Sequence, residues 1–179
     1  MSRRIRHGRR GIDLPLKNPP ASTDRVIGHD ASGNMHQFLA SAIGSPTILP
    51  FTPNVISSGT NPSFSWSTRH GVVARLGPLA YVEIRLTWNS RSGGTGAPRI
   101  LLPSSVVVSE NASSAMLPVR TDNVNLPSGC TWIVAYARPG ESALSLVASG
   151  ANVGASVITV AHMAPGGGSI FVSGTFLTQ

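Results

Sequence analysis

The sequence predicts an all-β protein: an antiparallel, jelly-roll-like β-sandwich preceded by an extended basic arm and a short hairpin–helix segment. Gly (19) and Pro (14) are plentiful while charged residues make up only 12%, which is typical of many short strands joined by tight turns. Leu79–Trp88 alternates apolar and polar side chains, the pattern of a strand with one buried face. Further short apolar runs recur at even spacing, which favours a sandwich or jelly roll.

The first 22 residues are predicted to form an extended basic arm. Six of the 14 Lys and Arg residues lie within the first 17 positions, so the basicity belongs to the arm and the rest of the chain is nearly neutral. A nearly neutral body does not favour a nucleic-acid-binding surface. We therefore expect the arm to anchor the chain on a partner protein. The anchoring residues would be Arg3, Arg4, Arg6, Arg9 and Arg10.

Residues 23–46 are predicted to form a hairpin followed by one or two helical turns near Gln37–Ile43. Arg25–Gly28 and Met35–Phe38 read as short strands around a polar turn. A hairpin and a helical turn cannot bury a core alone, so this segment is expected to oligomerise by packing against copies of itself. The predicted contacts between copies are Val26, Ile27, Phe38, Leu39 and Ile43.

Residues 47–179 are predicted to form the sandwich. Thr47–Ile56 can contribute an edge strand, because sheet edges tolerate proline. Gly77–Pro78 and Arg138–Glu141 read as turns. The other predicted strands are Phe64–Ser67, Gly71–Leu76, Leu79–Trp88, Arg99–Leu102, Val106–Ser109, Ala115–Val119, Thr131–Ala137, Ala143–Ala148, Val157–His162 and Ser169–Leu177. Trp66, Trp88 and Trp132 are expected to be core residues, since large rings bury the most area.

The titratable side chains show no catalytic pattern. No two carboxylates share a short, face-matched spacing, and no serine lies in a Gly-x-Ser-x-Gly elbow. The sequence therefore predicts a protein that is not an enzyme and that has no cofactor or metal. His29, Asp30 and His36 cluster across one turn, where three symmetry-related copies could hold a metal ion, but a plain polar hairpin is the favoured interpretation.

Two further features limit the class of protein. No apolar run approaches 18 residues, so we expect no membrane insertion. Cys130 is the single cysteine and is expected to be a buried, inert thiol.

The second part of the chain also resembles a known family, over Phe64 to Gln179. The residues that carry the resemblance are Gly71, Ala74–Gly77, Leu79–Val82, Gly94–Gly96, Ile100–Pro103 and the closing run Ser169–Thr178. This pattern resembles the small β-sandwich domain at the ends of bacteriophage tail fibres, tail spikes and head fibres. Val72–Ala74 departs from it, because an aromatic residue is common there in the family.

The resemblance implies a structural virion appendage, located in the virion, that attaches to the host surface. It also implies a homotrimer whose arm docks on another virion protein in the capsid, tail or baseplate. A host cell-surface glycan is one receptor that polar loops could bind; the candidate receptor contacts are Asn89, Arg91, Ser92 and Ser169. Head and tail locations both stay open. Two alternatives remain: a jelly-roll capsid protein of a small RNA virus with a genome-binding arm, and a carbohydrate-binding module.

Overall fold

The computed structural model describes residues 25–29, 35–39 and 46–179, and the chain divides into two units, Met1–Ser45 and Pro46–Gln179. In the first unit, β1 (Arg25–His29) pairs antiparallel with β2 (Met35–Leu39). The predicted hairpin is therefore confirmed. The predicted helix does not begin at Gln37, because β2 extends to Leu39; positions 40–43 lie outside the described residues.

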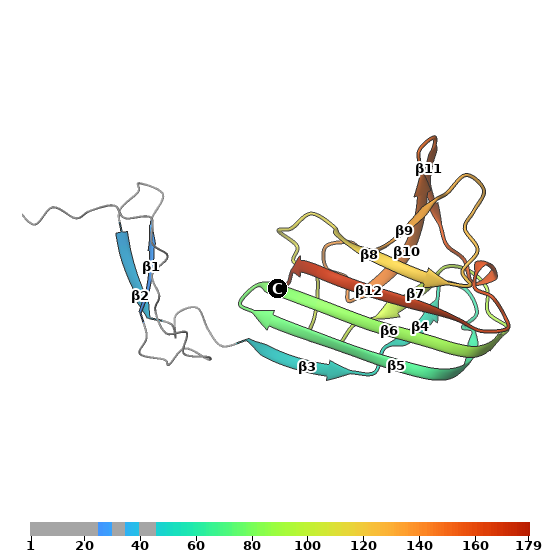
Figure 1. The fold of residues 1–179 in the computed structure, drawn as a ribbon, viewed down its shortest axis with the longest axis horizontal. Coiled ribbons are helices and arrows are strands. Elements are labelled where there is room, and N and C mark those ends of the chain that lie inside the picture. The colour runs from blue at the N-terminus through green and yellow to red at the C-terminus, as the bar shows by residue number, and fades with distance from the viewer. Residues whose placement is uncertain (1–24, 30–34, 40–45) are drawn as a thin grey trace, which may run out of the picture. The chain divides into compact units, whose positions relative to one another are not determined.

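The second unit is all-β and antiparallel, as predicted (Figure 1). Its strands are β3 (Thr47–Phe51), β4 (Asn54–Ser57), β5 (Ser63–Leu76), β6 (Leu79–Ser92), β7 (Pro98–Leu101), β8 (Ala115–Asp122), β9 (Trp132–Ala137), β10 (Ala143–Gly150), β11 (Val153–Val157) and β12 (Gly168–Leu177). A short 3₁₀ helix, η1 (Val160–His162), lies between β11 and β12. The strands follow one continuous, curled path in the order β3-β5-β6-β12-β8-β9-β10-β7-β4, and β11 pairs with β10.

Strand β8 joins the two halves of this path. Ala115–Pro118 pairs with β9, whereas Val119–Asp122 pairs with β12. The switch follows Pro118, which has no N–H to donate into a ladder and therefore suits a point where pairing changes. We call β3, β5, β6, β12 and the end of β8 the first half. The second half is the start of β8 with β9, β10, β7, β4 and β11.

The two ends of the path are neighbours in sequence. β3 and β4 are separated only by Thr52 and Pro53, yet β3 pairs with β5 in the first half and β4 pairs with β7 in the second. The prediction of a proline-tolerant edge strand is confirmed for β3, which contains Pro50 at one end of the path. The single strand predicted through Ile56 is in fact two strands.

The core lies between the inward faces of the two halves. In β6, Val82, Ile84, Leu86 and Trp88 are at most 2% exposed, and they share one apolar cluster with residues of β10 such as Leu146. Burying one such large side chain contributes about 1.5–3 kcal/mol. The alternation of β6 in the sequence thus correctly identified the central strand of the first half.

The indole of Trp88 is held by its surroundings. Its Nε1 donates to the carbonyl of Ala164 at 3.0 Å. A Cβ added to Gly168 would lie 2.5 Å from the ring, so only glycine fits opposite it. Trp88 is thus a core residue, as predicted, and Trp66 is half-buried against the same cluster.

Trp132 corrects the third tryptophan prediction, because its side chain is 47% exposed. In β9 the inward positions are Ile133, Ala135 and Ala137, which are buried. The large residues of this strand therefore lie on its outer face. The small alanines leave room for the bulky side chains of β6 on the other side of the core.

Three predicted strand assignments are also revised. Val106–Ser109 forms no strand; Val108 makes a single bridge to Thr178. Val157–His162, predicted as one strand, contains only the last residue of β11, Val157, followed by η1. Residues 63–76 form one continuous strand where two were predicted, with a bulge near Trp66.

The glycine-rich loop after β6 is tied to the connection between β4 and β5. The amide of Thr95 donates to the carbonyl of Thr60 at 2.9 Å, and the amide of Ala97 donates to Oγ of Ser58 at 2.9 Å. Gly96 has a φ of 80°, and an added Cβ would lie 2.7 Å from the nitrogen of Gly59. The glycine thus permits close packing of two loops.

Candidate functional site

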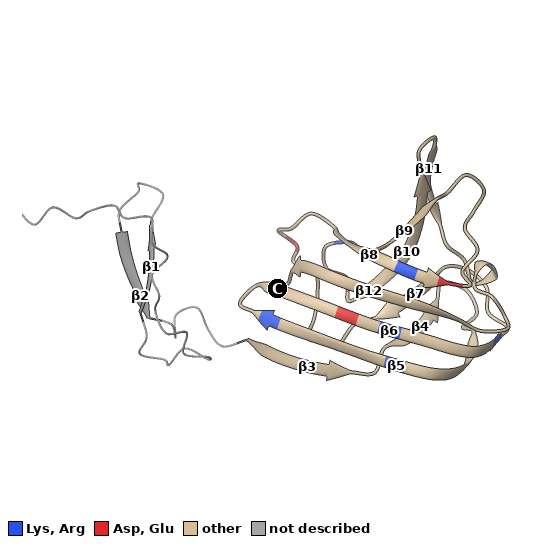
Figure 2. Cartoon of the chain, in the orientation of Figure 1, with Lys and Arg blue, Asp and Glu red and all other residues tan. Residues whose placement is uncertain are grey.

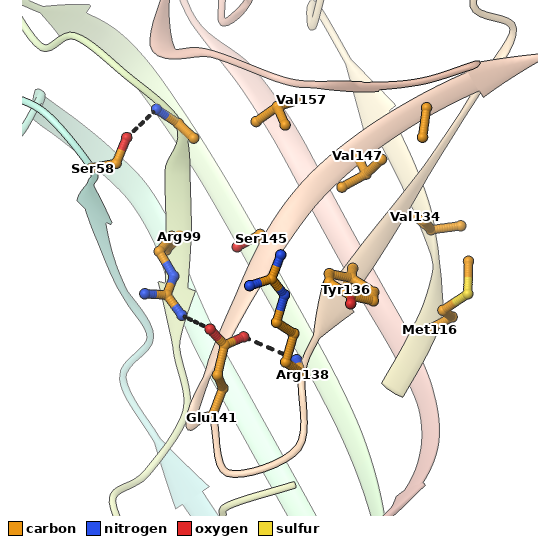
Figure 3. A pocket seen from close by; sticks show the side chains of 12 residues that line it. Ser58, Arg99, Met116, Val134, Tyr136, Arg138, Glu141, Ser145, Val147 and Val157 are labelled. Carbon is orange, nitrogen blue, oxygen red and sulfur yellow. Dashed lines mark hydrogen bonds and ion pairs between the residues drawn. The ribbon is translucent and has the colours of Figure 1, made fainter. Parts of the chain in front are cut away.

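A groove of about 560 Å³ lies on the outer face of the second half (Figure 3). This volume lies within the range of small-ligand sites. It is lined by residues of β7, β8, β9, β10 and β11 and of the loops beside them and after β4: Ser58, Ala97, Arg99, Met116, Val134, Tyr136, Arg138, Glu141, Ser145, Val147, Ala155 and Val157. The groove lies entirely within the second unit.

Strand register builds the groove as two parallel rows. Side chains at directly paired positions share a face of the sheet. One row is mainly polar and contains Met116, Tyr136, Ser145 and Arg99 on four successive strands. The neighbouring row is apolar and contains Pro118, Val134, Val147 and Val157. The groove therefore offers a polar strip beside an apolar one.

The polar end of the groove contains two guanidinium groups and one carboxylate. Nη2 of Arg99 lies 3.0 Å from Oε1 of Glu141, and the backbone amide of Arg138 donates to Oε2 of Glu141 at 2.9 Å (Figure 3). Gly140 has a φ of 79°, which allows the tight turn that brings Glu141 back. The predicted turn at Arg138–Glu141 is confirmed. The local formal charge is positive.

Arg99 is not fully satisfied by this ion pair. Its Nε is enclosed and has no hydrogen-bond acceptor among the described residues. Buried polar groups of native proteins nearly always have a hydrogen-bond partner, either in the protein or in ordered water. Arg99 and Glu141 are each 31% exposed, so the pair itself remains in contact with solvent.

Tyr136, a member of the polar row, contacts the loop before β8 through Ser114. Oγ of Ser114 and the phenol oxygen of Tyr136 are 3.1 Å apart, with the serine donating. This hydrogen bond lowers the pKa of Tyr136 below its ordinary value of 10.0, and the Arg138 guanidinium adds to the effect. Both groups favour the charged form of the phenol. The tyrosine is thus already engaged with the positive end of the groove.

Among residues 46–179 and the two described strands of the first unit, no group of three His, Cys, Asp or Glu side chains is placed to hold a metal ion. No helix of the described part of the chain has the length and hydropathy needed to cross a bilayer. The absence of enzyme activity remains a prediction.

The four candidate receptor contacts lie elsewhere, around the ends of β6 and β12. Asn89 and Ser92 are exposed. Arg91 is half-buried, and its guanidinium donates to the carbonyls of Met163 at 3.1 Å and Gly93 at 2.7 Å. Arg91 therefore ties loops together.

Ser169 is not placed to meet a receptor. It is 5% exposed, and its hydroxyl donates to the carboxylate of Asp122 at 2.6 Å. The glycine-rich turn before it suggested an exposed loop, but Ser169 already lies inside β12. Its hydroxyl instead links β12 to β8, so we remove it from the candidate contacts.

The other predicted site residues belong to the first unit. The arm residues Arg3, Arg4, Arg6, Arg9 and Arg10, together with Ile43 and Asp30, lie outside the described residues. The backbone register sets Val26 opposite Phe38, Ile27 opposite Gln37, Arg25 opposite Leu39, Gly28 opposite His36 and His29 opposite Met35. Their roles in oligomerisation or metal binding remain predictions.

Sequence reasoning missed most of the groove. Arg99 lies in β7 and Glu141 lies in the turn before β10, and the pairing between β7 and β10 brings the two side chains together. The one available signal was β9, in which Trp132, Val134 and Tyr136 alternate with a second apolar set. When a strand is apolar on both faces, we expect either that other parts of the protein cover both faces or that one face binds a ligand or partner.

The charges of the second unit are scattered over its strands and loops (Figure 2). On the outer face of the first half, Arg85 and Arg120 flank Phe171, with their guanidinium carbons 5.4 and 5.9 Å from the ring centre. These contacts cover the ring with hydrated groups. Neither arginine lines the groove, so a substitution at either one is a control for substitutions of the groove arginines.

The fold is similar to part of a known phage protein. No protein-family model and no curated protein sequence matches the chain. The crystal structure of the Dettilon tailspike protein matches over 75% of this chain with a TM-score of 0.59 and 17% sequence identity. The match covers 24% of the tailspike, so the chain corresponds to about a quarter of that protein's length. At this identity the likeness concerns the fold alone.

Proposed function

We propose that the chain is a structural component of a phage-like virion appendage, and that its second unit contacts the host surface. The observation that carries this proposal is the likeness of fold to a segment of a phage tailspike. It agrees with the family pattern in the sequence from Phe64 onward. The open groove on an outer sheet face supports a role in surface recognition.

The first unit would have two roles: it would hold the copies of the chain together, and it would attach them to the particle. In this proposal, residues 23–46 hold three copies as a homotrimer through Val26, Ile27, Phe38, Leu39 and Ile43. The five arginines of the arm would pair with carboxylates or carbonyl groups of a neighbouring virion protein. Exposed pairs of this kind contribute roughly 0–1 kcal/mol each, so anchoring would depend on several of them together.

The proposal assigns no catalytic step to this chain. In the groove, Glu141 is held by Arg99 and by a backbone amide, and Asp122 on the first half accepts from Ser169. Two carboxylates that flank a scissile bond at the separations used by glycosidases are needed for the usual hydrolysis of a glycan. Incubating the purified chain with surface polysaccharide should therefore release no fragments.

Immuno-electron microscopy tests the proposal directly. Antibodies raised against the second unit should label projections on particles that contain the chain, and the purified chain should compete with those particles for adsorption to host cells. Antibody labelling of a continuous icosahedral shell would instead support the capsid alternative. A chain without residues 1–20 should remain oligomeric but no longer join the particle, and normal incorporation would contradict the anchoring role.

A further inference from the structure

We propose that the groove on the second half binds a carboxylate-bearing sugar, so that the ligand class is an acidic glycan. This inference rests on the proposed function and names its receptor chemistry. The groove is formed by β-strands far apart in sequence, and neither the fold likeness nor the family pattern assigns it a ligand. The carboxylate of the sugar would lie at the end that contains Arg99 and Arg138.

Charge supports an anionic ligand. The two guanidinium groups have one carboxylate, Glu141, between them, and in Figure 3 the Arg138 side chain extends away from the Glu141 carboxylate. Because guanidinium groups bind carboxylates in a planar, two-pronged geometry, a sugar carboxylate fits this end better than a neutral hydroxyl does.

The remainder of the groove suits a sugar ring. Val134, Val147 and Val157 form an aliphatic floor across three paired strands, on which the C–H face of a pyranose can pack. Ser145 lies beside this floor, and its hydroxyl has no hydrogen bond among the described residues. Ser58, which directly follows β4, also lines the groove, and its hydroxyl accepts a hydrogen bond from the Ala97 amide. The apolar floor and hydroxyl-lined edge match the alternating faces of a sugar.

A sugar fits the open shape of the groove better than other anions with apolar parts. The groove lies on a sheet face, where backbone groups are already paired with neighbouring strands, so an extended peptide cannot add as a strand. The groove is also partly open to solvent, because Met116, Arg138 and Val157 in its lining are exposed, so an alkyl chain would remain partly in water. A glycan gains from both the aliphatic floor and the open side, since its outward hydroxyls stay hydrated.

Isothermal titration calorimetry with the full chain tests this inference. The probes are trigalacturonate and N-acetylneuraminyl-lactose, each compared with its carboxyl-reduced, neutral form. At least one acidic probe should bind, and its neutral form should bind about tenfold more weakly or worse, the effect of losing a charge-assisted hydrogen bond. If neither acidic probe binds at millimolar concentration, or if the neutral forms bind equally well, the inference is wrong.

Three variants locate the binding. Arg138→Gln should weaken binding of the acidic probe about tenfold. Arg120→Gln removes an equally exposed arginine outside the groove and should leave affinity unchanged. Glu141→Gln removes the carboxylate that competes for Arg99, so it should tighten binding by roughly threefold. A purely structural role for Glu141 predicts the opposite sign, and circular dichroism confirms that each variant is folded.

The bound anion should also be detectable at Tyr136. A carboxylate beside the phenol disfavours its ionisation, so saturating acidic probe should raise the pKa of Tyr136, observed by ultraviolet absorbance in a Tyr81→Phe background. An unchanged pKa would place the ligand elsewhere. If the antibodies label particles and the chain adsorbs to cells but no acidic sugar binds, this inference fails and the proposed function stands. If an acidic sugar binds but no projection on the particles is labelled, the proposed function fails and the ligand assignment stands.

Discussion

The two outer faces of the second unit differ although their inner faces follow the same pattern. Along the middle of the first half, β6 presents Tyr81, Glu83 and Arg85 outward, and Phe171 lies beneath two arginines. The second half leaves Met116 60% exposed and Val157 53% exposed in the groove that also contains the Arg99–Glu141 pair. The core constrains only every second residue of a strand. The alternate residues are therefore free to be hydrated in one half and to form a groove in the other.

The comparison is most sharply tested by adjacent residues of β10. Leu146 is fully buried in the core, whereas Val147 lines the groove. Leu146→Ala should lower the free energy of unfolding by about 2–5 kcal/mol, and Val147→Ala by less than about 1 kcal/mol. Urea denaturation measures both. Equal losses would show that the groove face is covered in solution by another copy or partner.

A second test compares alanine substitutions at two glycines, one in close-packed surroundings and one in open space. A Cβ at Gly168 would lie 2.5 Å from Trp88 and 2.8 Å from a backbone oxygen, while a Cβ at Gly154 would meet nothing within 4 Å. Gly168→Ala should therefore cost about 1–3 kcal/mol of unfolding free energy through overpacking. Gly154→Ala is the matched control and should change stability by less than about 0.5 kcal/mol. If the two substitutions behave alike, the packing described around Trp88 is wrong.

Alanine substitutions at two serines compare a hydroxyl group that makes a hydrogen bond within the fold with one that makes none among the described residues. Ser169→Ala removes the 2.6 Å hydrogen bond to Asp122 in the first half and should cost about 0.5–1.5 kcal/mol. Ser145→Ala in the second half removes a hydroxyl with no hydrogen bond among the described residues and should be close to neutral. Thermal unfolding of the two variants distinguishes them. A larger loss at Ser145 would mean that its hydroxyl already has a structural role.

The smallest expected effect is spectroscopic. Ser114→Ala removes the donor that lowers the pKa of Tyr136, so the pKa should move back up toward 10.0. Because a lowered pKa stabilises the folded state only where the phenol is ionised, the pH-dependent part of the stability lost in Ser114→Ala should appear only at alkaline pH. Absorbance titration with Tyr81→Phe isolates this tyrosine. A pKa that stays low in Ser114→Ala would assign the effect to Arg138.

The fold class could be predicted because most strands have clear local signals. The period-two alternation of Leu79–Trp88 identified β6, and Gly77, with a φ of 58°, forms the turn expected before it. Val106–Ser109 has equal β-propensity but is not a strand, because its backbone partners come from separate loops such as the carbonyl of Glu141. Propensity describes how a residue fits a sheet and cannot tell whether a neighbouring strand is present.

The groove could not be predicted because its geometry is non-local. Arg99 and Glu141 become an ion pair only once β7 and β10 align. Trp132 misled the core assignment for a related reason: β9 is apolar on both faces, and burial of Ile133 rather than Trp132 depends on the space left by the opposite half. A single sequence records the side-chain types of a strand but not which of two apolar faces points inward.

The position of β12 has a consequence for how the chain is made. This strand pairs with β6 on one side and β8 on the other, yet it follows both in the sequence. While a ribosome is still translating the residues before Gly168, β6 and β8 each have an open edge and Trp88 lacks its close neighbour. Unpaired strand edges are prone to aggregation. The nascent chain therefore depends on the last strand of the sheet to protect the strands that emerged long before it.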